Sequence, residues 1–107
     1  MSERVAAHVA AFNETVASGD WAQFSGRFAD DATLAFAGVP VGPFTGRAAI
    51  AAAYAEQPPT DTMTVIDVET DGDHDVARFA WSAGGTGTMR LTWRAGAVAS
   101  LTVSFDA

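Results

Sequence analysis

The hydrophobic pattern of the chain changes its period at about residue 61. Before that point apolar residues recur every three or four positions, as in Val5, Val9, Phe12 and Val16, which is the spacing of one helix face. Beyond it apolar and polar residues alternate, which is the spacing of strands with one buried face. This order predicts helices first and a sheet second, packed together as an α+β fold.

Two helices are predicted near the start of the chain. The first spans about residues 3–17 and ends at Ser18-Gly19. Asp20 can cap a second, short helix in the stretch DWAQFSGRF. By helical periodicity this second helix turns three aromatic residues inward, namely Trp21, Phe24 and Phe28.

The acidic pair Asp30-Asp31 is predicted to lie at the exit of the second helix, before a strand ATLAF. Adjacent residues on such a turn point apart, so we interpret the pair as a capping or solubility feature and not as a catalytic dyad. A loop rich in Gly and Pro, GVPVGPF, follows the strand. The third helix, RAAIAAAYAEQ, ends at Pro58-Pro59 and carries Ile50 and Tyr54 on one face.

Four further strands form an antiparallel meander, with turns at Asp71-Gly72, Gly84-Gly85 and Ala95-Gly96. The strands are DTMTVIDVET, DVARFAWSA, TGTMRLTWR and VASLTVSFD. Their alternation gives the sheet one aromatic face and one face of Thr, Ser and Arg. We therefore expect a single domain over residues 1–107, in which three N-terminal helices wrap one face of a curved, mostly antiparallel sheet.

Composition excludes several classes of function. A net charge of −7 disfavours nucleic acid and anionic membrane surfaces as partners. The absence of Cys excludes disulfides and thiolate chemistry. No apolar run has the character of a membrane span or a signal peptide, so a cytoplasmic location is expected. No phosphate, dinucleotide or metal-binding pattern is present, so neither a cofactor nor a metal is predicted.

One stretch, DVETDGDHDVAR, imitates the start of a calcium loop, with acids at positions 1, 3 and 5 and Gly72 at position 6. The twelfth position of a calcium loop is a bidentate Glu, and here it is Arg78. The flanking segments are also strands, whereas a calcium loop joins helices. We interpret the stretch as a solvated acidic hairpin.

The order of helix, SGDW, RFADDATL, Pro/Gly loop, FTGRAAIAAAY and four strands resembles the nuclear-transport-factor-2-like superfamily. Within it the chain is similar to the group of ketosteroid isomerases and SnoaL-like polyketide cyclases. The resemblance covers almost the whole chain and implies a cone-shaped roll around an apolar cavity, commonly as a homodimer.

The isomerases of this group use a Tyr on the first helix, an Asp near the end of the first strand and an acid on a late strand. Matched by position, these residues are replaced here by Phe12, Phe36 and Met89. Loss of one donor to the reacting oxygen costs about 10²–10³ in rate, and here the base is absent as well. The isomerase reaction is therefore not expected.

Two residues remain as catalytic candidates. Tyr54 matches a helix-three Tyr that in the isomerases bonds to the catalytic Tyr, and Phe12 now stands in that partner's place. Its hydroxyl either orients a ligand or reaches solvent or a backbone carbonyl. His8 lies one turn before Phe12; it is either a general base at the end of the cavity or a boundary residue with an ordinary hydrogen bond.

The aromatic residues suggest what the cavity would hold. The residues expected to contact a ligand are Phe12, Trp21, Phe36, Tyr54, Met63, Phe79, Trp81, Met89 and Trp93. A cone lined by such side chains fits an apolar, possibly cyclic, metabolite, which the protein would bind or convert by isomerase- or cyclase-like proton transfer. The alternative is a non-catalytic module that fills its own cavity and forms a homodimer through the polar sheet face, which includes Thr92 and Thr102.

Overall fold

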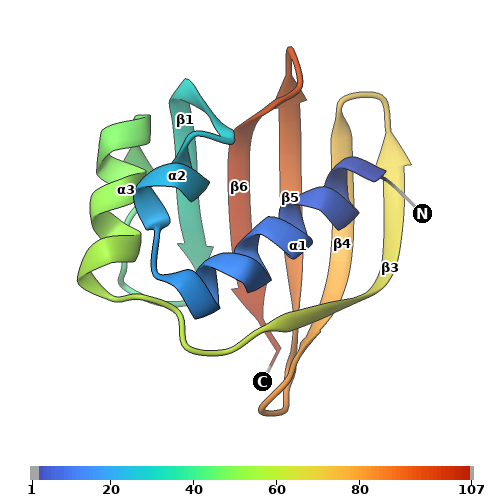
Figure 1. Cartoon of the computed structure of the whole chain (residues 1–107). Coiled ribbons are helices and arrows are strands. Elements are labelled where there is room, and N and C mark those ends of the chain that lie inside the picture. Colours follow the sequence, from blue (N-terminus) through green and yellow to red (C-terminus); the bar gives the residue numbers. More distant parts are fainter. Residues whose placement is uncertain (1–2, 107) are drawn as a thin grey trace.

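The computed structural model describes residues 3–106 and has a layer of helices packed on a six-stranded sheet (Figure 1). In chain order the elements are α1 (Glu3–Ser18), α2 (Trp21–Ser25), β1 (Phe28–Ala37), β2 (Phe44–Thr45), α3 (Arg47–Glu56), β3 (Met63–Asp71), β4 (His74–Trp81), β5 (Thr86–Arg94) and β6 (Ala97–Phe105). The predicted α+β roll is confirmed, and so are its three helices and the four-stranded meander.

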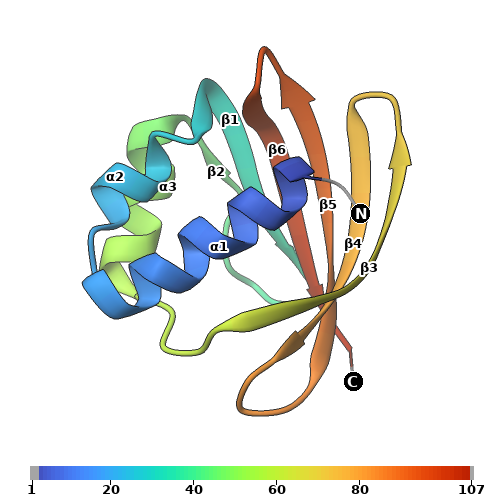
Figure 2. The same cartoon turned by 45° about the vertical axis from the view of Figure 1, so that its right-hand side comes forward.

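The strands are ordered β2-β1-β6-β5-β4-β3 across the sheet. β1 pairs with β6 in parallel, and every other neighbouring pair is antiparallel. All three helices lie on the same side of the curved sheet, with α1 crossing it (Figure 2). Between residues 3 and 106 no helix combines the length and the apolar character that crossing a bilayer requires.

The first two helices are joined by a turn that the local sequence explains. Gly19 adopts a φ of 78°, which glycine reaches without strain, and its N–H donates to the carbonyl oxygen of Thr15 at 2.7 Å, which ends α1. The Asp20 side chain then accepts a hydrogen bond from the N–H of Gln23 at 3.1 Å and caps α2 as predicted. The turn sets α2 beside α1 over the same side of the sheet.

The boundary between α2 and β1 differs from the sequence prediction. The helix ends at Ser25, and β1 already begins at Phe28, so Phe28 is buried as a strand residue and not on a helix face. Asp30 and Asp31 therefore lie inside β1 and not on an exit turn. Phe28 follows Phe24 at the four-residue spacing of a helix face, but it is buried as the first residue of β1. The spacing alone does not distinguish these two placements.

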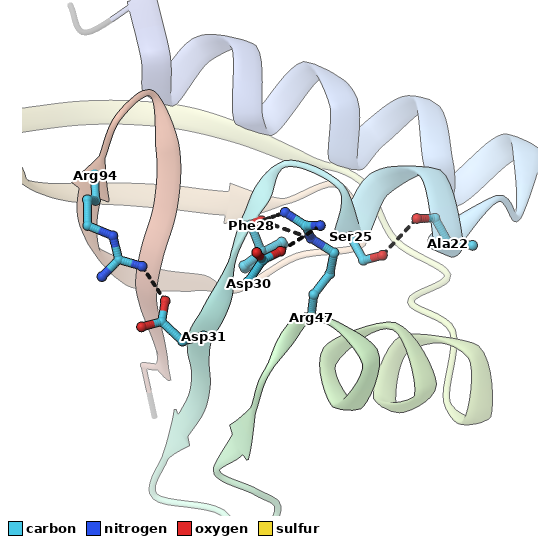
Figure 3. A network of polar contacts seen from close by, with 7 residues as sticks. All are labelled: Ala22, Ser25, Phe28, Asp30, Asp31, Arg47 and Arg94. Carbon is cyan, nitrogen blue, oxygen red and sulfur yellow. Dashed lines mark hydrogen bonds and ion pairs between the residues drawn. The ribbon is translucent and has the colours of Figure 1, made fainter.

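The two acids of β1 point to different arginines (Figure 3). Asp30 pairs with Arg47 at 2.9 Å, and Asp31 pairs with Arg94. Arg47 also donates two hydrogen bonds, of 3.1 and 2.8 Å, to the carbonyl oxygen of Phe28 (Figure 3). The contacts of Arg47 join the start of α3 to β1, and the pair of Asp31 and Arg94 joins β1 to the end of β5. Both acids therefore form ion pairs, beyond the capping and solubility that we expected.

A close approach between strands requires a glycine at position 87. A Cβ there would lie 2.6 Å from a ring atom of Phe79 and 2.6 Å from the carbonyl oxygen of Ser104. Because Gly87 lacks that atom, the fully buried Phe79 ring can lie directly over β5. The Phe79 ring therefore fills the inner face of the sheet beside Gly87.

The hairpin of β3 and β4 is acidic and mostly exposed, as predicted, except at Asp75. The side chains of Asp67, Glu69 and Asp71 are exposed. Asp75 alternates to the inner face of β4 and is only 1% exposed. The interpretation of a solvated hairpin is therefore wrong for Asp75, because strand alternation turns this one acid inward.

Buried Asp75 is fully provided with donors. Its carboxylate accepts hydrogen bonds from Arg4 Nε (2.5 Å), Thr70 Oγ1 (2.5 Å) and Trp93 Nε1 (2.8 Å). Burial would raise the pKa of Asp75, but these hydrogen bonds outweigh burial and hold the pKa below its ordinary value. We call these four residues the Asp75 cluster; it ties the first turn of α1 to the sheet.

Candidate functional site

The helices and the inner face of the sheet enclose a cavity of about 440 Å³. Its apolar walls come from α1, β1 to β6 and α3, and are formed by Phe12, Leu34, Phe36, Phe44, Ala53, Met63, Trp81, Met89, Leu101 and Val103. The volume lies within the range of small-molecule sites, and Glu56, at the opening, is the one charged side chain among the described residues that line it.

The cavity opens at an apolar rim. Val39 and Val41 of the loop between β1 and β2, and Phe105 at the end of β6, line the cavity yet are 41–46% exposed. Glu56 and Gln57 at the end of α3 also line it and are exposed. The opening therefore combines exposed hydrophobic side chains with a single carboxylate.

Tyr54 brings a hydroxyl to the cavity from α3. Its ring is 7% exposed, stacks on Trp21 (4.9 Å between centroids, 12° between planes) and meets Phe24 edge-on at 5.5 Å. Nothing within residues 3–106 forms a hydrogen bond with its hydroxyl. Burial raises the pKa of Tyr54 well above its ordinary value, so the hydroxyl stays protonated and can donate.

His8 brings the second polar group, from α1. Its ring is 2% exposed and packs against Phe24 (5.3 Å), Phe28 (5.9 Å) and Trp93 (6.5 Å). It lines the cavity, and its Nδ1 is buried without a partner in the described part of the chain. The structure thus places His8 deeper than a boundary residue, because the aromatic side chains of α2, β1 and β5 surround it.

The surroundings of His8 fix its charge. Burial lowers the pKa of His8 to about 4, with a further contribution from the positive charge of Arg27. The imidazole is therefore neutral at pH 7. A group with so low a pKa is a weak proton acceptor at neutral pH, so the site favours hydrogen bonding by His8 over general-base catalysis.

The residues predicted to contact a ligand divide into two groups. Those that line the cavity are Phe12, Phe36, Tyr54, Met63, Trp81 and Met89. Three others lie behind the wall: Trp21 supports the Tyr54 ring, Phe79 is fully buried edge-on to Trp81 (5.0 Å), and Trp93 donates to Asp75. These three complete the core because their rings have neighbours on every side.

Sequence reasoning missed the rim of the cavity. Val39 and Val41 lie in the loop that the sequence marks only as rich in Gly and Pro, and the signal for them was an apolar residue on either side of Pro40. Phe105, in the predicted strand VASLTVSFD, was not among the residues expected to contact a ligand. Elsewhere in residues 3–106, no three His, Asp or Glu side chains are grouped as metal ligands would be.

The sequence model of the SnoaL-like domain matches residues 9–103, which is most of the chain. The chain belongs to the SnoaL-like domain family. This finding confirms the resemblance on which the cone-shaped fold and the apolar cavity were expected. A comparison with curated proteins gives no significant match.

Solved structures agree with this assignment at the level of the fold. A hypothetical protein from Catenulispora acidiphila with a ketosteroid isomerase-like fold, in complex with trimethylamine, superposes with a TM-score of 0.80 at 19% identity, covering 96% of this chain and 85% of that one. An NTF-2 like protein of unknown function from Burkholderia xenovorans gives 0.73 at 19% identity, with 97% and 84% covered. A de novo designed protein with a curved β-sheet gives 0.70 at 18% identity, with 99% and 88% covered.

Proposed function

We propose that this SnoaL-like protein binds an apolar, ring-containing small molecule in the cavity and orients it through Tyr54. The observation that carries the proposal is a protonated tyrosine hydroxyl that lines an open apolar cavity and has no partner in residues 3–106. A hydroxyl in such a place has no protein acceptor, so it is free to donate to a ligand oxygen.

The size and lining of the cavity support a compact apolar ligand. A volume of about 440 Å³ accommodates a molecule of two or three fused rings. Aromatic and thioether side chains such as Phe12, Trp81 and Met89 favour flat, polarizable surfaces. The trimethylamine in the C. acidiphila structure supports small organic molecules as ligands of this fold.

The walls argue against the isomerase reaction. Phe12, Phe36 and Met89, which stand where the isomerases carry catalytic groups, all line the cavity. None of these three side chains can move a proton. If the protein converts its ligand, Tyr54 and His8 are the polar groups inside the cavity that could take part, in a proton transfer of the isomerase or cyclase type.

A cavity-filling substitution tests the proposal. The two methionines at positions 63 and 89 line the cavity, so ¹³C-methyl methionine labels place reporters inside it. We expect 1-tetralone, a two-ring ketone, to shift both methyl signals in the wild-type protein and in Ala52→Phe, whose exposed position lies outside the cavity. Ala53→Phe, which fills the cavity, should abolish the shifts. If 1-tetralone still shifts the methionine methyl signals in Ala53→Phe, or does not shift them in the wild-type protein, the proposal is contradicted.

A second function, formation of a homodimer through the outer sheet face, is favoured by the composition of that face. The helices leave it uncovered between residues 3 and 106 (Figure 2). Most of its central side chains are short and half-buried, with the exposed Arg90 among them; the short ones are Ala35, Val76, Ala80, Thr88, Thr92, Ser100 and Thr102. Short side chains on a broad sheet allow close contact with a second copy.

Sedimentation velocity tests this assembly. We expect a dimer that Thr92→Glu combined with Thr102→Glu converts to a monomer, because the two carboxylates would meet their copies across the interface. Thr60→Glu, on an exposed loop, should leave the dimer intact. A dimer that tolerates the double substitution rules this face out, and a monomeric wild type rules out the assembly.

A further inference from the structure

The charge at the opening of the cavity is negative and is not balanced by a neighbouring cation. Glu56, the last residue of α3, is exposed and lines the cavity. Among residues 3–106 its carboxylate has no ion-pair partner. None of the arginines in this range lines the cavity either. The carboxylate is therefore available to a positively charged group of a ligand.

Three aromatic rings that line the cavity provide a second attraction for a cation. The Phe105 ring stacks with the Phe36 ring (6.4 Å between centroids, 5° between planes) and with the Trp81 ring (6.4 Å, 18°). The face of an aromatic ring attracts a cation that lies within about 6 Å of its centroid. Phe105 is 46% exposed, so this attraction extends to the opening.

The charge of the whole protein acts in the same direction. A net charge of −7 attracts cations to the opening and disfavours anions there. A charged group loses its hydration when it enters an apolar interior, which is costly. A ligand that has apolar rings and one charged end therefore places its rings in the cavity and leaves the charged end at the opening.

We infer that the ligand is a cation whose rings occupy the cavity and whose protonated amine remains at the opening, against the Glu56 carboxylate and the Phe105 ring. This ligand class rests on the proposed function, which supplies the apolar rings and their orientation by Tyr54. Glu56 is then a specificity residue, because it distinguishes amines from carboxylic acids that have the same ring skeleton.

Three probes of similar size test the charge preference. 2-Aminotetralin and tetralin-2-carboxylate carry opposite charges at neutral pH on the skeleton of tetralin, a two-ring hydrocarbon without a polar group. Uncharged 1-tetralone is the reference. The methyl signals of Met63 and Met89 report the binding of each probe inside the cavity. We expect 2-aminotetralin to bind about tenfold more tightly than the carboxylate.

Matched substitutions assign this preference to the opening. We expect Glu56→Gln to lower the affinity for 2-aminotetralin, relative to that for 1-tetralone, about threefold. Glu69→Gln removes the same charge from an exposed position of β3 outside the cavity, and should keep the wild-type ratio of affinities. Phe105→Leu keeps an apolar side chain but removes the aromatic face, so it should lower the ratio about twofold.

The outcomes separate this inference from the proposed function. If 1-tetralone enters the cavity but the amine binds no more tightly than the carboxylate, the inference is overturned and the proposed function stands. A ratio that Glu56→Gln lowers no more than Glu69→Gln overturns the role of Glu56, and an unchanged ratio in Phe105→Leu overturns that of Phe105. If no probe shifts the methionine signals, the proposed function fails and the inference fails with it.

Discussion

Two buried polar groupings lie under α1 and differ in how they are partnered. In the Asp75 cluster the carboxylate accepts three hydrogen bonds from Arg4, Thr70 and Trp93. In the cavity, the hydroxyl of Tyr54 has no partner in residues 3–106; Nδ1 of His8 also has none there, but that atom is buried while the His8 ring lines the cavity. A satisfied buried group holds elements of the fold together, whereas a hydroxyl that faces an open cavity without a protein partner is available for a ligand.

The largest expected effect is on stability, from the satisfied cluster. Asp75→Asn replaces an anion by an amide whose N–H₂ faces donors, so we expect the free energy of unfolding to fall by about 3–4 kcal/mol in urea denaturation. Asp67→Asn is the matched control, since Asp67 pairs with Arg78 at 3.5 Å with both side chains more than half exposed. It should cost less than about 0.5 kcal/mol. Equal effects of the two variants would show that the Asp75 cluster does not hold the fold.

The second effect is the pH dependence of stability, which separates the two groupings. His8 has a pKa of about 4 in the folded protein and an ordinary value of 6.5 when unfolded. The unfolded chain therefore gains a proton first, so stability is complete above about pH 6.5 and falls by about 3 kcal/mol as the pH drops to about 4. The lowered pKa of Asp75 keeps its carboxylate charged over this range, so the cluster contributes to acid destabilisation only at lower pH.

Thermal unfolding between pH 4.5 and 7 measures this effect. His8→Gln should flatten the profile in that range, because glutamine does not titrate. His74→Gln should keep the wild-type profile, since His74 is exposed on the β3–β4 hairpin. If the two variants follow the same profile, the buried neutral state of His8 is contradicted.

The smallest effect is on affinity and comes from the unsatisfied grouping. Tyr54→Phe removes a hydroxyl that has no protein partner, so the free energy of unfolding should change by less than about 1 kcal/mol. The affinity for 1-tetralone should fall about tenfold while that for tetralin stays the same. Calorimetric titration of both ligands measures this. Unchanged tetralone affinity would remove Tyr54 from the site.

Periodicity sufficed to predict the helices and the meander, because α1 and the strands from β3 onward bury residues at regular spacing. It failed where a residue's environment depends on distant parts of the chain. Phe28 fits a helix face as well as a strand, and only its pairing opposite Val98 decides between them. Asp75 looked solvated because its partner Arg4 lies 71 residues away.

The candidate site was predictable in part. The aromatic and methionine positions followed from strand alternation, and Tyr54 followed from family resemblance. Whether a given ring lines the cavity or fills the core depends on small differences in position, as between Phe12 and Trp21, whose centroids lie 5.7 Å apart. The partnerless Nδ1 of His8 follows from packing against three rings and has no signal in the sequence.

The most direct test of the central claim is a set of intermolecular NOEs from bound 1-tetralone. We expect NOEs from the ligand ring to the methyl groups of Met63 and Met89 and to the imidazole of His8, with none to the side chain of Ile66. Ile66 is the matched negative control because it is 45% exposed and lies outside the cavity. NOEs confined to the exposed rim at Val39 and Phe105, or to Ile66, would contradict the claim that a ligand lies inside the cavity beside Tyr54 and His8.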